Sequence, residues 1–166
     1  QPIMQRYGDG FDAFLAAVPQ LASLGYLGDV ARLEQALRAS CHAADTSPLE
    51  AAALAELTPA QLTQTRLEFA PTVHLIASVW PLFDIWRFNS EDGAPKPQPV
   101  AQHVLVTRAG YDPAPHPLSP AQGAWIAALM AGASLDGAQD AAAQIDPDCD
   151  IATPMALLFA QNAVTG

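Results

Sequence analysis

The feature that most constrains this chain is one uninterrupted helical pattern, which runs from Tyr26 to Asp45 and reads YLGDVARLEQALRASCHAAD. Apolar residues recur in it at steps of three and four, the spacing that places side chains on one face of an α-helix. That face consists of Tyr26, Val30, Leu33, Leu37, Cys41 and Ala44, with Ala36 and Ser40 at its edge. Pro48 follows closely, and the residue before a proline avoids the helical conformation. We therefore predict a core helix with a polar rim, on which the rest of the chain packs.

Two polar pairs on the rim of this helix suggest different roles. Glu34 precedes Arg38 by one helical turn, the favourable orientation for an ion pair within a helix. His42 lies close to Asp45, a spacing in which a carboxylate could orient a histidine that acts as a base. A histidine on a polar face is more often simply solvated, and no nucleophile lies nearby in the sequence. We therefore predict that this protein is not an enzyme.

The composition is that of a folded, helix-rich chain. It has 166 residues, of which 51% are hydrophobic and 14% are charged. No apolar run approaches the roughly 18 residues that a membrane-spanning helix needs, so we predict no membrane segment. The opening QPIMQRYGDG is not a signal peptide. Because the chain opens on Gln1 and not on Met, we expect a fragment or a processed product.

The cysteines argue against both a disulfide framework and a metal site. Cys41 and Cys149 are the only two, and they lie far apart in the sequence. Neither belongs to a CxxC pair or to a set with metal-ligand spacing. We interpret Cys41 as a small buried side chain and Cys149 as a thiol in an acidic loop. A reducing cytoplasm fits this usage, and we expect no metal or cofactor.

The charge of the chain disfavours nucleic acid as a partner of this segment. The formal net charge is −10, from 17 acidic and 7 basic residues. A phosphate backbone would be repelled unless a basic patch formed locally. The basic residues are scattered along the sequence: Arg6, Arg32, Arg38, Arg66, Arg87, Lys96 and Arg108.

Three helix starts of one form follow the long helix. Each places Ser or Thr before a proline, with Glu or Gln three residues after the hydroxyl, as in a capping box with proline at the first helical position. They are Ser47-Pro48-Leu49-Glu50, Thr58-Pro59-Ala60-Gln61 and Ser119-Pro120-Ala121-Gln122. We therefore predict helices that begin near residues 48, 59 and 120. A shorter amphipathic helix is predicted before them, with Phe11, Phe14, Leu15 and Val18 on one face and Asp9 or Gly10 as its cap.

The remaining segments predict a small sheet followed by helices. Residues 66–76 alternate like a strand that is broken at Pro71, with His74 on the face opposite Val73 and Leu75. Residues 78–88 form an aromatic-rich helix, and residues 89–99 a proline-rich loop. Residues 100–118 predict a β-hairpin that turns at Ala109-Gly110, with the prolines of its second arm confining that arm to a sheet edge. Three helices complete the chain, at about 120–131, 135–144 and 151–163.

The fold class that follows is α+β and mostly helical. We expect a helical part over residues 1–65 and a small winged-helix-like α+β unit over residues 66–166, with the loop at 89–99. In such a unit a helix can read DNA, or a sheet edge can accept an extended peptide as an added strand. Residues 135–144 carry no positive charge, which favours the peptide. The predicted peptide- or partner-binding residues are His103, Val104, Leu105, Val106 and Arg108 of the hairpin with Met155 and Phe159 of the last helix.

The sequence also resembles the HvfC-like family, which is catalogued as a DNA-binding domain family. The likeness lies in Tyr7–Phe11 with Phe14-Leu15, Tyr26–Glu34, His42–Asp45, Trp80-Pro81 with Ile85–Arg87, and Leu105–Arg108. Members usually carry a further N-terminal helical region, to which the DNA-binding label belongs, and this sequence starts where that region ends. Gln35 stands where the family usually has Trp.

The resemblance implies a function in peptide maturation. Family members work beside a multinuclear non-haem iron oxidase that modifies cysteines in a small ribosomal peptide, and the HvfC-like protein helps to present that precursor peptide. We therefore expect a non-catalytic accessory protein that recognises the precursor peptide, the oxidase or both. The alternative is a transcription regulator whose DNA-binding region is the further N-terminal part.

Overall fold

The computed structural model describes residues 10–21 and 23–166, and over these the protein is α+β and mostly helical. The predicted cap at Asp9, the family residues Tyr7 and Gly8 and the cation Arg6 lie outside the described residues. The elements, in chain order, are α1 (Phe11–Ala17), the 3₁₀ helix η2 (Pro19–Leu21), α2 (Leu27–His42), α3 (Ala51–Ala55), α4 (Pro59–Gln64), β1 (His74–Ile76), α5 (Leu82–Ser90), β2 (His103–Thr107), β3 (Ala114–Leu118), α6 (Pro120–Met130), α7 (Leu135–Ala143) and α8 (Ala152–Ala160).

The three strands form one antiparallel sheet with β2 in the middle. β1 pairs with β2 so that His74 lies opposite Val106, and β3 pairs with β2 so that His116 lies opposite Leu105. This confirms the predicted hairpin and the edge position of its proline-rich arm. The turn is wider than predicted, because β2 ends at Thr107 and β3 begins only at Ala114.

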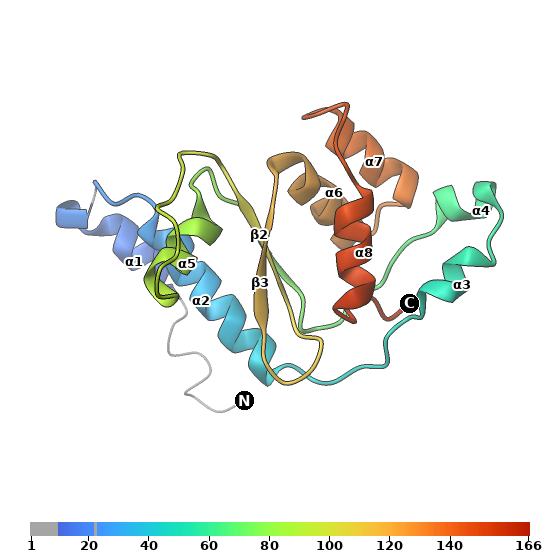
Figure 1. Cartoon of the computed structure of the whole chain (residues 1–166), viewed down its shortest axis with the longest axis horizontal. Helices are drawn as coiled ribbons and strands as arrows, with labels where there is room; N and C mark the ends of the chain where they lie inside the picture. The colour runs from blue at the N-terminus through green and yellow to red at the C-terminus, as the bar shows by residue number, and fades with distance from the viewer. Residues whose placement is uncertain (1–9, 22) are drawn as a thin grey trace.

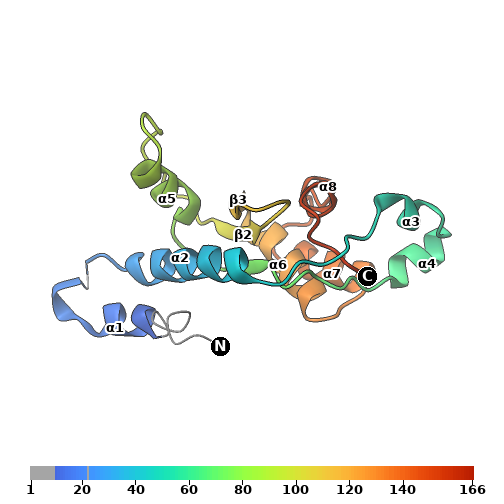
Figure 2. The same ribbon diagram turned by 90° about the horizontal axis from the view of Figure 1, so that it is seen from below.

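Helices cover both faces of the sheet, because β2 is apolar on both sides. Alternate side chains of a strand point to opposite faces. Val104 and Val106 therefore face one helical layer while Leu105 faces the other, and all three are fully buried. Figure 1 shows α1, α2 and α5 on one side of the hairpin and α6, α7 and α8 on the other. Figure 2, turned by 90°, shows α2 passing along the sheet while α3 and α4 extend away from it.

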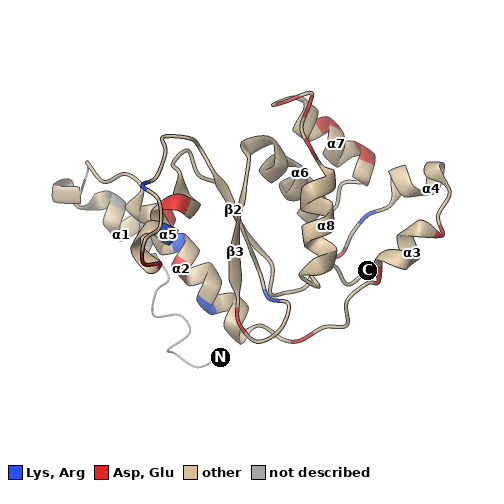
Figure 3. Cartoon of the chain, in the orientation of Figure 1, with Lys and Arg blue, Asp and Glu red and all other residues tan. Residues whose placement is uncertain are grey.

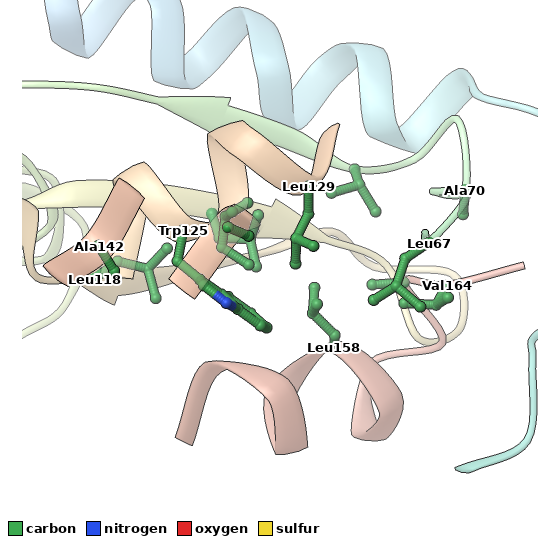
Figure 4. Close-up of a cluster of buried hydrophobic side chains, with 13 residues drawn as sticks. Leu67, Ala70, Leu118, Trp125, Leu129, Ala142, Leu158 and Val164 are labelled. Carbon is green, nitrogen blue, oxygen red and sulfur yellow. The ribbon is translucent and has the colours of Figure 1, made fainter. Parts of the chain in front are cut away.

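The larger core lies between the sheet and the three C-terminal helices. Trp125, Ile126 and Leu129 of α6 are completely buried there, together with Leu158 of α8. Figure 4 shows the Trp125 ring reaching toward α8 and Leu67 and Val164 closing the far end of the cluster. Each large side chain so buried stabilises the fold by about 1.5–3 kcal/mol. Met130, which was predicted on the same stripe, is 40% exposed, because the helix ends there and its side chain leaves the core.

The smaller core joins α2 and α5 to the opposite face of the sheet. Its buried members are Leu33, Ala36, Ile76, Leu82, Val104 and Val106. The buried stripe of α2 is shifted from the predicted one, since Leu33, Ala36 and Ser40 are buried whereas Cys41 is exposed. The prediction of a buried Cys41 is therefore wrong. The sheet packs against the edge of the helix that carries Ala36 and Ser40. These side chains are small, so the helix can lie close to the sheet there.

Polar contacts fix α2 at both ends and in the middle. Near its start, Ser78 Oγ donates to Asp29 Oδ2 over 2.5 Å. In the middle, Trp86 Nε1 donates to Glu34 Oε1 over 2.9 Å. Glu34 therefore pairs with α5, in place of the intrahelical partner Arg38 that the sequence predicts. These contacts and the smaller core tie the first predicted unit to the second, and the boundary at residues 65–66 stays a prediction.

At the other end of α2, Arg108 binds the helix terminus. Its Nη1 donates to the carbonyl oxygens of Ser40 (2.7 Å) and Cys41 (2.9 Å), and its Nη2 to the carbonyl of Ala43 (3.1 Å) and to Asp45 Oδ1 (2.6 Å). The last carbonyls of a helix have no partner within the helix, and a cation there also favours the helix dipole. Asp45 is thereby paired with Arg108 and is not the partner of His42 that the sequence suggested.

The chain end occupies a place that the sequence did not predict. α8 ends at Ala160, and Ala163 and Val164 are buried beyond it. The backbone N–H of Ala70 donates to the carbonyl of Ala163 (2.9 Å), and that of Leu49 donates to the carbonyl of Val164 (2.8 Å). This second bond ties Leu49 to the chain end, and residues 44–50 form no helix. The predicted helix start at Ser47 is therefore wrong, and α3 begins at Ala51 with no side-chain cap.

The other two predicted capping boxes are confirmed. They are formed by Thr58 with Gln61 and by Ser119 with Gln122. In each, the hydroxyl of the capping residue accepts from the backbone N–H of the glutamine. The side-chain oxygen of the glutamine accepts in turn from the backbone N–H of the capping residue. The predicted aromatic helix starts four residues late, at Leu82 and not at Ser78. The Ser78 hydroxyl donates to Asp29 of α2 and accepts from the backbone N–H of Trp80 (3.0 Å), in the segment that precedes the helix. The long strand predicted over residues 66–76 is reduced to β1, with isolated bridges at Arg66 and Phe69.

Gly123 allows α6 to lie directly on a histidine of the sheet. A Cβ atom built at Gly123 would be 1.9 Å from His103 Nδ1 and 2.8 Å from His103 Cβ. The second atom is fixed by the backbone of β2, so the ring cannot simply turn aside. Close packing of α6 on β2 therefore requires glycine at this position.

We expect Gly123→Ala to lower the free energy of unfolding by about 2–4 kcal/mol, since overpacking a rigid contact forces the helix off the sheet. The matched control is Gly137→Ala in α7, where a Cβ would meet only Ser134 Oγ at 3.5 Å and Ala133 Cβ at 3.8 Å. Alanine is the better helix former, so this control gains about 0.5–1 kcal/mol. Urea denaturation of both variants measures the difference, and equal stabilities would contradict the packing described.

A second variant tests the terminus of α2. We expect Arg108→Met to lower the free energy of unfolding by about 2–4 kcal/mol, because several carbonyls lose a charged donor. Arg87→Met is the control, since Arg87 pairs only with Glu91 on the surface of α5, with side chains 36% and 52% exposed. Such a pair contributes about 0.5 kcal/mol or less. The same urea denaturation decides, and similar losses in the two variants would contradict a special role of Arg108.

Candidate partner-binding surface

The structure places the predicted binding residues in four different surroundings. Val104, Leu105 and Val106 are completely buried in β2, whose two edges are both used by neighbouring strands. These residues therefore support the sheet from within and offer no backbone edge to a peptide. Arg108 binds the terminus of α2, with its side chain 6% exposed. Met155 and Phe159 of α8 are both partly exposed.

Met155 and Phe159 of α8 differ in how they pack. Met155 packs against the larger core, whereas Phe159 belongs to neither core cluster. The first turn of α8 is held by Asp150, whose Oδ1 accepts from the backbone N–H of Ala152 over 2.9 Å and whose Oδ2 accepts from Thr153 Oγ1 over 2.5 Å. The bonds from Thr153 hold the pKa of the Asp150 carboxyl below its usual value. Phe159 therefore lies on a helix with an anchored start.

The sheet has two outer edges, on β1 and on β3, and no strand among residues 10–21 and 23–166 pairs with either edge. The candidate edge is that of β3, which belongs to the predicted hairpin. Pro115 and Pro117 lie opposite Val106 and Val104. Proline has no N–H, so the ladder bonds to β2 come from the alternate residues of β3, including His116. The outward-facing backbone groups are then the carbonyls of the two prolines, without any N–H between them.

A polar chain links this strand to the end of α8. Thr107 Oγ1 lies 2.8 Å from His116 Nε2 and 3.3 Å from Gln161 Oε1. A hydroxyl carries one proton, so all three groups are bonded when Thr107 donates to Gln161 and His116 Nε2–H donates to Thr107. Thr107 is fully buried, and burial lowers the pKa of His116, so the ring stays neutral at pH 7. The three residues fix the position of α8 relative to β3.

The predicted residue His103 lies beneath α6. Its ring packs on Gly123, and Nδ1 is buried without a hydrogen-bond partner. Burial lowers the pKa of this ring, so it too is neutral at pH 7. His103 therefore belongs to the packing of α6 on the sheet and not to an exposed binding surface.

The positive charges are mostly engaged within the protein. Seven residues are Lys or Arg, and six of them lie in the described ranges. Four of these six bind groups of the protein itself: Arg32 to Asp29, Arg66 to the carbonyl of Gly132, Arg87 to Glu91 and Arg108 to the end of α2. Figure 3 shows acidic residues on α7 and on the loop before α8, and no basic residue there. The described surface therefore lacks a basic patch for phosphate groups.

The described residues do not form a recognisable catalytic or metal centre. Among them, no three His, Cys, Asp or Glu side chains gather in a way that could hold a metal ion. Burial, with help from the negative charges of Asp146 and Asp150, raises the pKa of the Cys149 thiol, the opposite of what a nucleophile needs. His42 is exposed on α2, and its neighbour Asp45 is bound to Arg108.

Comparison with known proteins adds no relative. No family model, no curated protein and no solved structure matches this chain. None of the described helices is both long and apolar enough to cross a membrane.

The sequence did not single out Pro115, His116, Pro117 and Gln161 as parts of one surface. The alternation of prolines with Ala114, His116 and Leu118 was the available signal, because it leaves one side of a strand without donors. Gln161 could not be found in this way, since its contact depends on the angle at which α8 lies on the sheet.

The two thiols should differ in reactivity toward a disulfide reagent. Cys41 is exposed, whereas the partly buried Cys149 has a raised pKa and carries less of the reactive thiolate at mildly alkaline pH. We expect Cys41 to react roughly tenfold faster or more. Stopped-flow kinetics on Cys41→Ser and Cys149→Ser assign the two phases, and a faster reaction of Cys149 would contradict the geometry.

Proposed function

We propose that this chain is a non-catalytic accessory protein that recognises an extended segment of a ribosomal precursor peptide, for maturation by a multinuclear non-haem iron oxidase. The observation that carries the proposal is the unpaired edge of β3, held next to α8 by the bonds among Thr107, His116 and Gln161. An extended peptide can lengthen a sheet at such an edge, with side chains of a neighbouring helix providing specificity. The resemblance to the HvfC-like family supports the choice of peptide and of oxidase.

The prolines define how a peptide would bind at this edge. The carbonyls of Pro115 and Pro117 accept hydrogen bonds, but neither residue can donate one. The peptide would therefore supply N–H groups at two alternate positions, while its carbonyls at those positions stay solvated. Only half of the usual ladder forms, so side-chain contacts must supply more of the affinity. Phe159 is the partly exposed aromatic residue of α8 available for this contact.

The alternative, a transcription regulator, draws no support from the described residues. The helix that the sequence offered as a recognition helix is α7, and it carries Asp136 and Asp140 with no Lys or Arg. The whole of residues 119–166 contains no basic residue. DNA contact would then require a region other than the described one, and the charge of this part would oppose it.

The direct test is isothermal titration of this chain with candidate cysteine-containing precursor peptides and, separately, with a candidate multinuclear non-haem iron oxidase, both sought among the proteins encoded beside its gene. We expect binding of at least one of them. If the peptide binds, its backbone N–H groups can be methylated at every second position, in two separate peptides. Methylation of the positions that face β3 should abolish binding, and methylation of the positions between them should leave the affinity nearly unchanged. No heat with either partner would end the proposal for this chain.

Matched variants locate the contact. We expect Phe159→Ala to weaken peptide binding roughly tenfold. Phe88→Ala, which removes an aromatic ring that is 50% exposed on α5, should leave the affinity unchanged. Equal effects of the two variants would place the peptide elsewhere, even if binding itself is confirmed.

A further inference from the structure

His74 occupies an unusual position between the sheet and α2. It lies opposite Val106 in the pairing of β1 with β2, so its side chain projects from the same face as Val106, the face that α2 covers. Its Nε2 atom is buried and has no hydrogen-bond partner in the protein. A buried polar atom without a partner is costly even when neutral, and a charge there costs more.

The part of α2 that covers His74 is its C-terminal half. Ser78 binds Asp29 near the start of α2, and Arg108 binds the carbonyls of Ser40 and Cys41 at its end. These two anchors orient α2 antiparallel to β1, which places the first residue of β1, His74, toward Ser40. Ser40 is itself fully buried, and its hydroxyl also has no partner.

The charged groups around His74 offer it no compensating anion. Arg108 follows the end of β2 directly, and its guanidinium already binds Asp45 and the last carbonyls of α2. On α2, Arg38 and His42 are exposed on the side away from the sheet. On the opposite face of the sheet, α6 carries no charged residue. Burial alone lowers the pKa of His74, without a contribution from a neighbouring charge. A proton on His74 would therefore place a charge without a partner in a space between two packed layers.

We propose that His74 makes the attachment of α2 to the sheet sensitive to protons, so that acidification releases the C-terminal half of α2 while α6 stays packed. Release places the His74 ring in water and uncovers the apolar side chains of the smaller core, among them Ala36 and Val106. The chain thus carries a conformational device that is separate from the proposed peptide edge on β3.

The direction of the pH effect follows from burial. Burial lowers the pKa of His74 below its usual value in the docked state. A released ring regains its ordinary pKa of about 6.5 and takes up a proton more readily. The docked state is therefore fully favoured above about pH 6.5, and it loses stability relative to the released state as the pH falls below that value.

Hydrogen exchange of the full chain tests this device at about pH 7.5 and about pH 5.5, with rates corrected for the intrinsic effect of pH. On acidification we expect the protection of residues 36–42 to fall roughly tenfold more than that of residues 124–130 in α6. His74→Gln replaces the ring by a polar side chain of similar size that does not titrate. In this variant, acidification should lower the protection of α2 no more than that of α6. His42→Gln removes an exposed histidine from the same helix and should behave as the unaltered chain does.

Two results would overturn the proposal. One is equal loss of protection in α2 and α6, which would indicate general acid sensitivity, with His103 beneath α6 contributing. The other is an extra loss in α2 that persists in His74→Gln. If that variant does not fold, proton NMR of the unaltered chain decides, because the ring signal of His74 and the amide signals of residues 36–42 must then titrate with one midpoint. Separate midpoints would exclude His74 as the trigger.

Discussion

The contact between Arg108 and the last turn of α2 is the interaction on which the arrangement of this protein most depends. One guanidinium, on the residue that follows β2, occupies three backbone carbonyls at the end of a helix from the other half of the chain. The last carbonyls of a helix lack the partners that interior carbonyls have, although that of Ser40 also accepts a long bond from the Ala43 N–H (3.3 Å). With Asp29 bound to Ser78 at the start of α2, the helix is fixed in direction and in register on the sheet. Leu33 and Ala36 then meet Val104 and Val106, and the smaller core forms.

The middle strand transmits this constraint to the opposite layer. β2 is paired on both edges and buried on both faces, so α2 and α6 lie on two sides of a single strand. Close contact on the α6 side needs Gly123, where even a methyl group would meet the ring of His103. The outer strand β3 is different, because its prolines remove the donors from its exposed edge. Such an edge resists pairing with a second copy of itself, and yet it can still accept N–H groups from an extended ligand.

Local patterns predicted much of this fold, and long-range contacts account for most of the errors. The predictions that depend on neighbouring residues are confirmed: the hairpin, the edge position of β3 and the capping boxes at Thr58 and Ser119. The identical signal at Ser47 failed because Leu49 bonds to the carbonyl of Val164, more than a hundred residues away. Ser78 was expected to cap a helix, but its hydroxyl accepts from Trp80, before the helix begins, and donates to Asp29 of α2. Cys41 was expected in the core, but the sheet contacts the edge of the stripe and not its centre.

The candidate surface was predictable only in part. The sequence identified the hairpin and the last helix, and Phe159 remains a candidate there. It also named Val104, Leu105 and Val106, which are apolar because both faces of β2 are buried. Three consecutive apolar residues are typical of a strand buried on both faces, whereas a strand with one exposed face alternates, so the sequence did carry a signal against an exposed role for them. The role of Arg108 was hidden, because the carbonyls that it binds leave no mark in the sequence.

The most direct test of this account is native-state hydrogen exchange at neutral pH, followed in α2 and α6 as denaturant is added. If Arg108 and the smaller core join the two halves into one cooperative unit, the slowest amides of α2 and α6 should exchange with the same free energy and the same dependence on denaturant. If the slowest amides of α2 instead open at much lower free energy and with little dependence on denaturant, the helix is a separate and weakly attached element. That result would contradict the central place given to the contact of Arg108 with α2.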